Sequence, residues 1–138
     1  MIYLDSCLVI YLVEQHAQYG DTIARLVEQE GTFAFAISPL VKCECLVGPL
    51  RRGNSVLQQE YLEVFREFVL VDMPEPMYLR AAELRARFGV KLPDALHLAC
   101  AQHHHCDAFW TNDDRLARAP HGLVRSIFAP GINPRSAS

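Results

Sequence analysis

Four acidic side chains occupy positions from which their carboxylates could share a metal ion. They are Asp5, Glu44, Asp94 and Asp113, and we refer to them as the acidic quartet. Asp5 and Asp113 each follow a short apolar run that predicts a strand, while Glu44 and Asp94 fall in the first or second turn of predicted helices. Open parallel sheets place ligand groups outside the carboxyl ends of their strands, so we expect the quartet to meet in one crevice.

Carboxylates held together in one crevice repel one another and need a compensating charge. A bound proton, a cation or a basic side chain can supply that charge. Because every donor of the quartet is an oxygen atom, Mg²⁺ or Mn²⁺ is favoured over Zn²⁺. Such an ion lowers the pKa of a bound water and stabilises in-line displacement at phosphorus. The quartet therefore indicates hydrolysis of a phosphodiester.

Two members of the quartet also have structural interpretations. The segment Leu92–Ala99 predicts a helix that Pro93 begins, because proline has a preset φ and lacks an N–H that a first turn would leave unpaired. Apolar residues follow on nearly every side, which indicates a buried helix. Asp94 could therefore cap this helix, and Glu44 could turn from its apolar stripe into solvent.

The elements that must position these acids alternate along the chain. Strands are expected at 2–4, 32–37, 69–71, 107–110 and 126–128. Helices are expected at about 7–15 with Ser6 as N-cap, from 19 to Gly31, from Pro39 with Ser38 as N-cap, and at 57–68, with a basic loop at 48–53. A further helix is expected to begin at Pro74 and Pro76 and to end at Gly89, with Met77, Ala81, Leu84 and Phe88 facing inward. The last two are a helix that begins at Pro93 and a short helical turn that ends at Arg118. This alternation predicts an α/β sandwich with a mostly parallel sheet.

Composition sets the broad class of the protein. The 138 residues are 51% hydrophobic and 21% charged, which suits one packed domain at 1–130 with a loose tail at 131–138. No apolar run reaches the ~20 residues of a membrane span, and the odd count of five cysteines indicates reduced thiols, so we expect a cytoplasmic protein. The net charge of −3 neither indicates nor excludes a nucleic-acid partner.

Two histidine features could suggest other chemistry. Side chains of the run His103–His105 point in different directions on a helix, so we interpret the run as a polar helix end rather than a zinc site. His97 lies three residues after Asp94 and could approach the crevice, where a packed, hydrogen-bonded role is preferred to that of a general base. The sequence contains no glycine-rich phosphate loop, G-x-S-x-G or H-E-x-x-H motif.

The motifs around the quartet resemble those of a known family. They are Tyr3-Leu4-Asp5-Ser6, Glu44 on the third helix, Leu92-Pro93-Asp94-Ala95-Leu96 and Thr111-Asn112-Asp113. Their order and spacing over most of the chain resemble the PIN domain and, within it, the VapC-type toxins of toxin–antitoxin pairs. The resemblance implies a three-layer sandwich, with a short, mostly parallel sheet of four to five strands flanked by about seven helices.

The same resemblance implies an endoribonuclease that depends on Mg²⁺ or Mn²⁺. The quartet would supply its catalytic and metal-binding acids, and Thr111 and Ser6 would supply the hydroxyls beside them. Asp114 would have at most an auxiliary role at the site. Such toxins form homodimers and are inhibited by a cognate antitoxin whose basic tail enters the acidic pocket. The apolar segment Leu8–Val13 and the helix from Met77 to Phe88 are candidate contact surfaces, with core burial as the alternative.

Two other functions remain open at this stage. One is a non-catalytic PIN-fold binding module, although the complete quartet argues against a degenerate member. The other is a different phosphoryl-transfer enzyme with an acidic pocket, but an aspartyl nucleophile usually needs a nearby lysine and Lys42 and Lys91 are the only lysines. Four basic residues are candidate phosphate contacts: Lys42, Arg51, Arg52 and Arg115. The alternative is that they form a solvated basic surface.

Overall fold

The chain folds around a short, fully parallel sheet, seen here in a computed structural model that describes residues 1–118 and 122–128. The strands are β1 (Ile2–Leu4), β2 (Phe35–Ile37), β3 (Val69–Leu70), β4 (Ala108–Thr111) and β5 (Val124–Ser126). Their order is β3-β2-β1-β4-β5, and every ladder is parallel. The predicted parallel α/β architecture is therefore confirmed, while the proposed tail at 131–138 lies outside the described residues.

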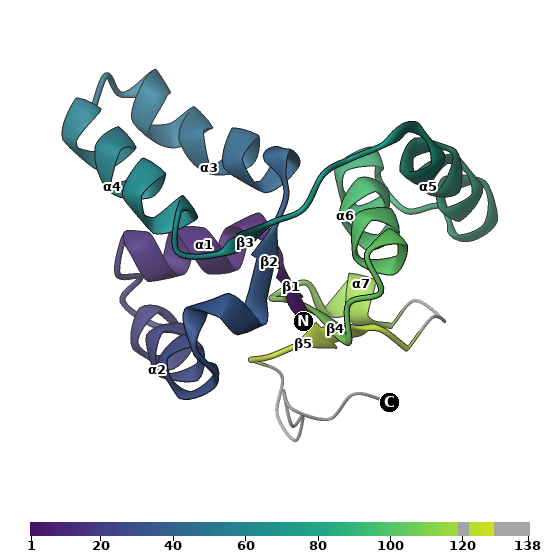
Figure 1. Cartoon of the computed structure of the whole chain (residues 1–138), viewed down its shortest axis with the longest axis horizontal. Helices are drawn as coiled ribbons and strands as arrows, with labels where there is room; N and C mark the ends of the chain where they lie inside the picture. Colours follow the sequence, from purple (N-terminus) through teal and green to yellow (C-terminus); the bar gives the residue numbers. More distant parts are fainter. Residues whose placement is uncertain (119–121, 129–138) are drawn as a thin grey trace.

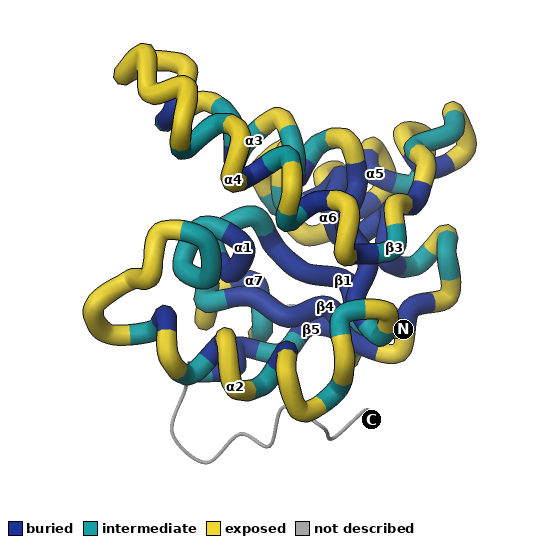
Figure 2. The backbone as a smooth tube through the Cα atoms, turned by 60° about the vertical axis from the view of Figure 1, so that its left-hand side comes forward, coloured by how far each residue is buried: buried dark blue, intermediate teal, exposed yellow. Residues whose placement is uncertain are grey.

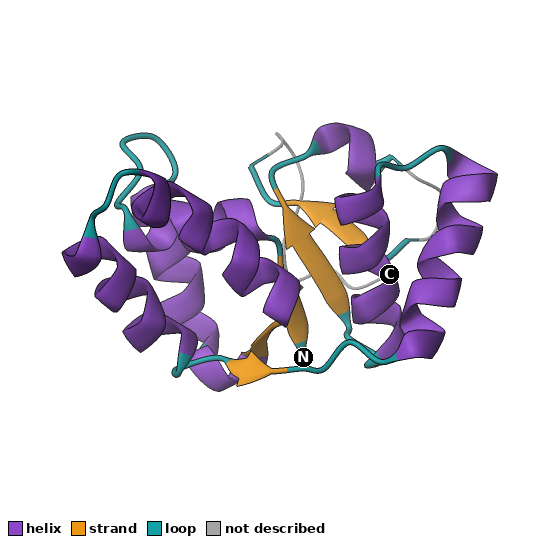
Figure 3. Ribbon diagram, turned by 90° about the horizontal axis from the view of Figure 1, so that it is seen from above, coloured by secondary structure: helices purple, strands orange, loops and turns teal. Residues whose placement is uncertain are grey.

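Helices flank the sheet on both sides. They are α1 (Ser6–Val13), α2 (Gly20–Glu30), α3 (Pro39–Arg51), α4 (Ser55–Phe65), α5 (Glu75–Phe88), α6 (Leu92–His103) and α7 (Asp114–Ala117), with a 3₁₀ turn at Thr32–Ala34. Helices α1 to α4 lie on one side of the strands and α5 and α6 on the other, which gives the predicted three layers (Figures 1 and 3). Among the described residues, no helix combines the length and apolar character that crossing a membrane requires.

The core is centred on β1 and its two neighbours. Tyr3 lies opposite Ala36 on one side and Phe109 on the other, and all three are buried. In Figure 2 the central strands are buried along most of their length, and only Ile2 of β1 is partly exposed. A parallel sheet covered on both faces needs such unbroken apolar strands. The run from Ala95 to Ala101 on α6 is also buried throughout, as its composition predicts.

Several local boundaries differ from the sequence predictions. Asp5, not Ser6, is the N-cap of α1, because its backbone is extended and its carboxylate accepts from the Ser6 N–H. Residues 32–34 form a 3₁₀ turn, so only 35–37 belong to the second strand.

Three further differences come from tertiary packing. The predicted basic loop at 48–53 is helical as far as Arg51, with Pro49 buried inside α3 where this helix packs against α4. Phe88 is 40% exposed rather than inward, although Met77, Ala81 and Leu84 are buried as expected. The last strand runs at 124–126 instead of 126–128, because it pairs with β4 from Phe109 onward.

Candidate active site

The topology of the sheet creates a crevice between β1 and β4. From β1 the chain proceeds outward to β2 and β3, and it then returns to add β4 and β5 on the other side. Ligands of open α/β sheets bind where the strand order reverses in this way, outside the carboxyl ends of the strands. Asp5 directly follows β1 and Thr111 ends β4, and the Asp5 N–H donates to the Trp110 carbonyl at 3.0 Å.

Hydrogen bonds fix the carboxylate of Asp5 in this crevice. Its Oδ2 accepts from Thr111 Oγ1 at 2.7 Å, and its Oδ1 accepts from the Ser6 N–H at 2.8 Å. Thr111 Oγ1 in turn accepts from the Asp113 N–H at 3.1 Å. Asp5 is only 9% exposed, so these donors replace much of the water that its charge would otherwise bind.

Glu44 and Asp5 meet at the buried ring of His97. His97 Nε2 lies 2.5 Å from Glu44 Oε1 and 3.8 Å from Asp5 Oδ1. One ligand atom from each of these residues lies within 4.8 Å of the others, and no other such group of His, Cys, Asp or Glu occurs in the described part of the chain. Among the described residues, the run His103–His105 belongs to no such group. Sequence reasoning gave His97 a packed role, and its spacing from Asp94 was the available signal.

Burial and hydrogen bonding act in opposite directions on Glu44. Partial burial favours the protonated acid, but the hydrogen bond with His97, helped by one with Ser6, more than offsets burial and lowers the pKa of Glu44. Glu44 is therefore held as a carboxylate beside Asp5. The alternative of a side chain that turns fully into solvent does not fit this contact.

Asp94 and Asp113 complete the wall of the same pocket. Its lining consists of Asp5, Ser6, Cys7, Tyr11, Glu44, Asp94, Thr111, Asn112, Asp113, Asp114, Arg115 and Arg118. Asp113 is the N-cap of α7, where Oδ1 accepts from the Arg115 N–H at 2.9 Å and lies 3.7 Å from Arg115 Nε. The structure thus brings all four acids to one pocket, and a ligand atom of Asp5 lies within 4.8 Å of one of Glu44.

Asp94 is the quartet member with the least compensation. Across residues 1–118 and 122–128 its carboxylate has no hydrogen-bond or ion-pair partner, and the N-cap of α6 is Lys91. The capping interpretation therefore does not apply to Asp94. Burial, followed by the charges of Asp5 and Asp113, raises the pKa of Asp94. The raised pKa of Asp94 thus reflects its burial first and the neighbouring acids second, with no described partner to offset either.

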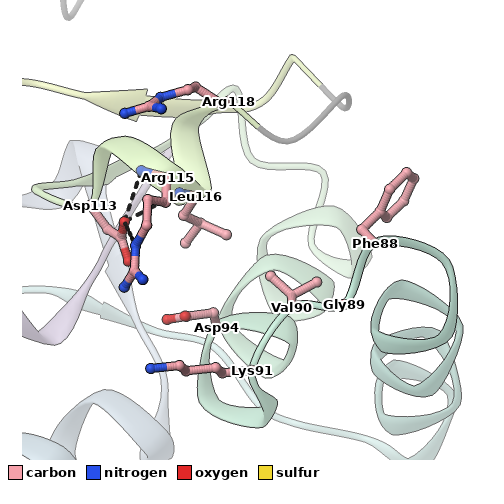
Figure 4. Close-up of a pocket in the computed structure, with 9 residues that line it drawn as sticks. All are labelled: Phe88, Gly89, Val90, Lys91, Asp94, Asp113, Arg115, Leu116 and Arg118. Atoms are coloured by element: carbon pink, nitrogen blue, oxygen red, sulfur yellow. Dashed lines mark hydrogen bonds and ion pairs between the residues drawn. The ribbon is translucent and has the colours of Figure 1, made fainter.

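A second pocket adjoins the first and shares Asp94 and Asp113 with it. It is lined by Phe88, Gly89, Val90, Lys91, Asp94, Asp113, Arg115, Leu116 and Arg118. Figure 4 shows the side chains of Asp94, Lys91 and Arg115 extending toward the same space, with Arg115 beside Asp113. Cations and carboxylates therefore border one another where the two pockets meet.

The basic residues considered from sequence divide into two groups. Arg115 lines both pockets, and Arg118, which the sequence analysis did not single out as a phosphate contact, lines both as well. Lys42 and Arg52 lie outside these pockets, because Lys42 sits 5.7 Å from the centre of the Phe65 ring and Arg52 pairs with a glutamate elsewhere. Arg51 is exposed at the end of α3 and lines neither pocket.

Two further residues of the pocket have assigned contacts. Asp114 accepts a short hydrogen bond from the Ser126 hydroxyl, so it is tied to β5 rather than directed at the quartet. Cys7 lines the pocket, but burial and then the charge of Asp5 raise the pKa of its thiol to about 12. A thiol in that state is not a nucleophile. All five cysteines are unpaired, as expected.

Solved structures share this fold over most of their length. A toxin–antitoxin complex from Klebsiella pneumoniae aligns with a TM-score of 0.74 and 23% identity, covering 91% of this chain and 96% of the other. VapC20 of Mycobacterium tuberculosis, described as a sarcin–ricin loop cleaving toxin, aligns with a TM-score of 0.75 and 16% identity over 91% and 99% of the two chains. VapBC2 of Rickettsia felis, bound to a promoter DNA fragment, aligns at 0.73 and 20% identity over 91% and 98%.

The sequence itself gives the family. No curated protein matches the chain by sequence. A family model for the PIN domain, however, matches residues 2–122, which include every strand but β5 and all four acids of the quartet. This protein is therefore a member of the PIN domain family.

Proposed function

We propose that this protein is a metal-dependent endoribonuclease of the VapC toxin type, inhibited by a cognate antitoxin. The observation that carries the proposal is the meeting of Asp5, Glu44, Asp94 and Asp113 at one pocket. Several uncompensated carboxylates cost stability in a folded domain, so their retention in one place supports a functional role. Membership of the PIN domain family supports the same conclusion.

The donors of the pocket fit a hard divalent cation. Asp5, Glu44 and Asp94 offer carboxylate oxygens, and the raised pKa of Asp94 reflects burial together with the charges of Asp5 and Asp113. Mg²⁺ and Mn²⁺ prefer such oxygen sets. When bound, the ion would activate a water molecule and stabilise charge at the scissile phosphate. Asp113, held by α7, would orient water from the opposite wall.

The residues beside the quartet have defined tasks in this proposal. Thr111 and the Ser6 N–H hold the two oxygens of Asp5, so that its carboxylate stays directed into the pocket. Lys91, Arg115 and Arg118 border the adjoining pocket, where they can contact the phosphates that flank the cleaved bond. Together they would place an RNA strand across the quartet.

A second groove, which shares no lining residue with the acidic pocket, suits the antitoxin. Helices α1, α2 and α4 line it, with apolar residues that include Leu12, Val13 and Val27. Its acidic residues are Glu28, Glu60, Glu63 and Glu67. A basic amphipathic segment matches this apolar floor and acidic rim, and a basic tail beyond it could reach the quartet. This supports part of the predicted contact surface at Leu8–Val13.

Two further parts of the proposal concern assembly and location. Tyr78 and Leu79 on α5 are 46% and 62% exposed, which supports α5 as the contact face of a homodimer. The proposed RNA substrate and the unpaired cysteines support a cytoplasmic protein.

Cleavage of single-stranded RNA by wild type and Asp94→Asn, with Mg²⁺ or Mn²⁺, tests the function. We expect wild type to cut and the variant to lose activity, since the variant removes one metal-binding oxygen while keeping the shape of the side chain. Equal cleavage by both proteins would indicate a contaminating nuclease. Absence of cleavage by both, across varied RNAs, would favour a binding module.

A further inference from the structure

A chain of buried hydrogen bonds leads from the start of α3 through the core to Glu44. The Val41 N–H donates to Ser38 Oγ at 3.3 Å, and Ser38 Oγ lies 2.7 Å from the Tyr3 hydroxyl. The Tyr3 hydroxyl lies 2.7 Å from His97 Nδ1, and His97 Nε2 lies 2.5 Å from Glu44 Oε1. Ser38 and Tyr3 are 0% exposed and His97 is 1% exposed, so water does not compete along this path.

Counting donors gives the chain a direction. If Ser38 donates to Tyr3 and Tyr3 donates to His97 Nδ1, then Nε2 carries the ring proton and donates to Glu44. Every hydrogen then has an acceptor. In the reverse direction the buried Ser38 hydroxyl would have no acceptor among the described residues, which is unfavourable. The contacts therefore favour Nδ1 as the acceptor from Tyr3 and Nε2 as the donor to Glu44.

We propose that His97 is a positioning residue, held by Tyr3 and Ser38, that orients the Glu44 carboxylate and is not itself a metal ligand. This inference rests on the proposed function, because it assigns how one acid of the quartet is prepared for the ion. Both ring nitrogens are already engaged, so ligation by His97 would require breaking its contact with Glu44. A partner behind a ligand that fixes its orientation strengthens metal binding.

The chain also connects the elements that carry the site. Tyr3 belongs to β1, Ser38 caps α3, and His97 lies on α6, so the contact with Glu44 ties α6 to α3 through the sheet. The relative position of Asp94 on α6 and Glu44 on α3 is thereby constrained. A small change at Tyr3, within the core, should for this reason be measurable at the acidic pocket.

The first experiment measures Mn²⁺ affinity by electron paramagnetic resonance titration for wild type, Tyr3→Phe and Tyr61→Phe. Tyr61 is a matched control, because it is buried like Tyr3 and its hydroxyl donates a 2.5 Å hydrogen bond to Glu14 Oε2, outside the acidic pocket. We expect Tyr3→Phe to weaken Mn²⁺ binding by about 10-fold or more, and Tyr61→Phe to leave it unchanged. Equal affinity of Tyr3→Phe and wild type would overturn the inference.

A second pair of variants guards against general damage to the fold. His97→Gln keeps an N–H that can reach Glu44, whereas His97→Leu removes it. We expect His97→Gln to bind Mn²⁺ more tightly than His97→Leu at similar melting temperatures. Equal weakening in both variants would show that the ring itself is needed and would contradict the positioning role.

Spin-echo modulation of the Mn²⁺-loaded wild type tests ligation directly. We expect no coupling from a directly bound imidazole nitrogen, and such a coupling would make His97 a ligand and overturn the inference. Failure of the proposed function and failure of the positioning role give different results. Wild type that neither binds Mn²⁺ nor cuts RNA refutes the proposed function, whereas wild type that does both, with Tyr3→Phe unchanged, refutes the positioning role alone.

Discussion

Glu14 and Glu44 have similar contacts but opposite surroundings. Glu14 Oε2 accepts from the Tyr61 hydroxyl at 2.5 Å, and its Oε1 accepts from Arg52 Nη2 at 3.3 Å. Glu44 also has a short contact to a buried ring, that of His97. Glu14 thus has an arginine of its own, whereas Glu44 shares the His97 ring with Asp5 and lies in a pocket with three other acids of the quartet.

This difference separates a structural acid from a candidate catalytic one. At Glu14 the charge is matched by Arg52, and burial with the hydrogen bond to Glu14 raises the pKa of Tyr61, which keeps that hydroxyl a donor. At the quartet, Arg115 approaches only Asp113, and Asp94 responds with a raised pKa. Excess charge, rather than the presence of an acid, marks the site.

The largest expected contrast is catalytic. Glu44→Gln should reduce RNA cleavage by about 100-fold or more, because it removes a charged oxygen from the ion's surroundings. Glu14→Gln, the same change at the compensated acid, should leave cleavage within about twofold of wild type. Initial rates on one RNA at saturating Mg²⁺ measure both, and a comparable loss in Glu14→Gln would contradict the difference between the two acids.

The next contrast is stabilisation by the ion. At an ion concentration about 100 times its Kd, binding adds about 2.7 kcal/mol to the folded state, which raises Tm by roughly 5–10 °C. We expect this rise in wild type and Glu14→Gln, and its near absence in Asp94→Asn. Thermal unfolding with Mn²⁺ and with EDTA measures it. A full rise in Asp94→Asn would remove Asp94 from the set of ligands.

The pH dependence of the metal-free protein is expected to be smaller. The raised pKa of Asp94 means that its ionised form destabilises the fold above that pKa, and the cost disappears as pH falls toward 3.8. Asp94→Asn should therefore melt a few degrees above wild type at pH 7, with a difference that shrinks in acid. The lowered pKa of Glu44 has the opposite effect on folding stability. The ionised Glu44 stabilises the fold, and this stabilisation is lost as pH falls through that pKa. A melting temperature of Asp94→Asn below that of wild type at pH 7 would contradict the repulsion.

The smallest effect should come from the compensated pair. The side chain of Arg52 is 55% exposed, so its ion pair with Glu14 contributes only about 0–1 kcal/mol. Arg52→Gln should lower Tm by no more than about 3 °C and leave RNA cleavage unchanged. Thermal unfolding in low and high salt provides the measurement, and a large drop would show that this pair is needed for the fold.

The sequence predicted the elements well where the signal was local. Pro93, Ser38 and Gly89 mark helix ends as expected, and Gly89 ends α5 in the left-handed conformation at φ 66°. The errors arose where packing overrode local preference. Pro49 stays inside α3 because that helix is held against α4, and Phe88 remains half-exposed beside the second pocket.

The candidate site divides in the same way. The quartet could be named from sequence, since acids that follow strands or open helices in a parallel sheet converge on one edge. The hydrogen-bonded partners behind Glu44 could not be predicted in this way. Tyr3, Ser38 and His97 are distant in sequence, and they form a series of hydrogen bonds only because they meet in the core. Nor could the sequence separate Arg115, which lines the pocket, from Arg52, which pairs with Glu14.

By itself the sequence determined the fold class and which acids gather at the sheet edge, because periodicity, caps and strand ends are short-range properties of the chain. Only the tertiary structure decided which of those charges are compensated and which hydrogen bonds orient them. Those outcomes depend on the separation of atoms across the sheet and on the exclusion of water between them. Both arise when β1, α3 and α6 pack together.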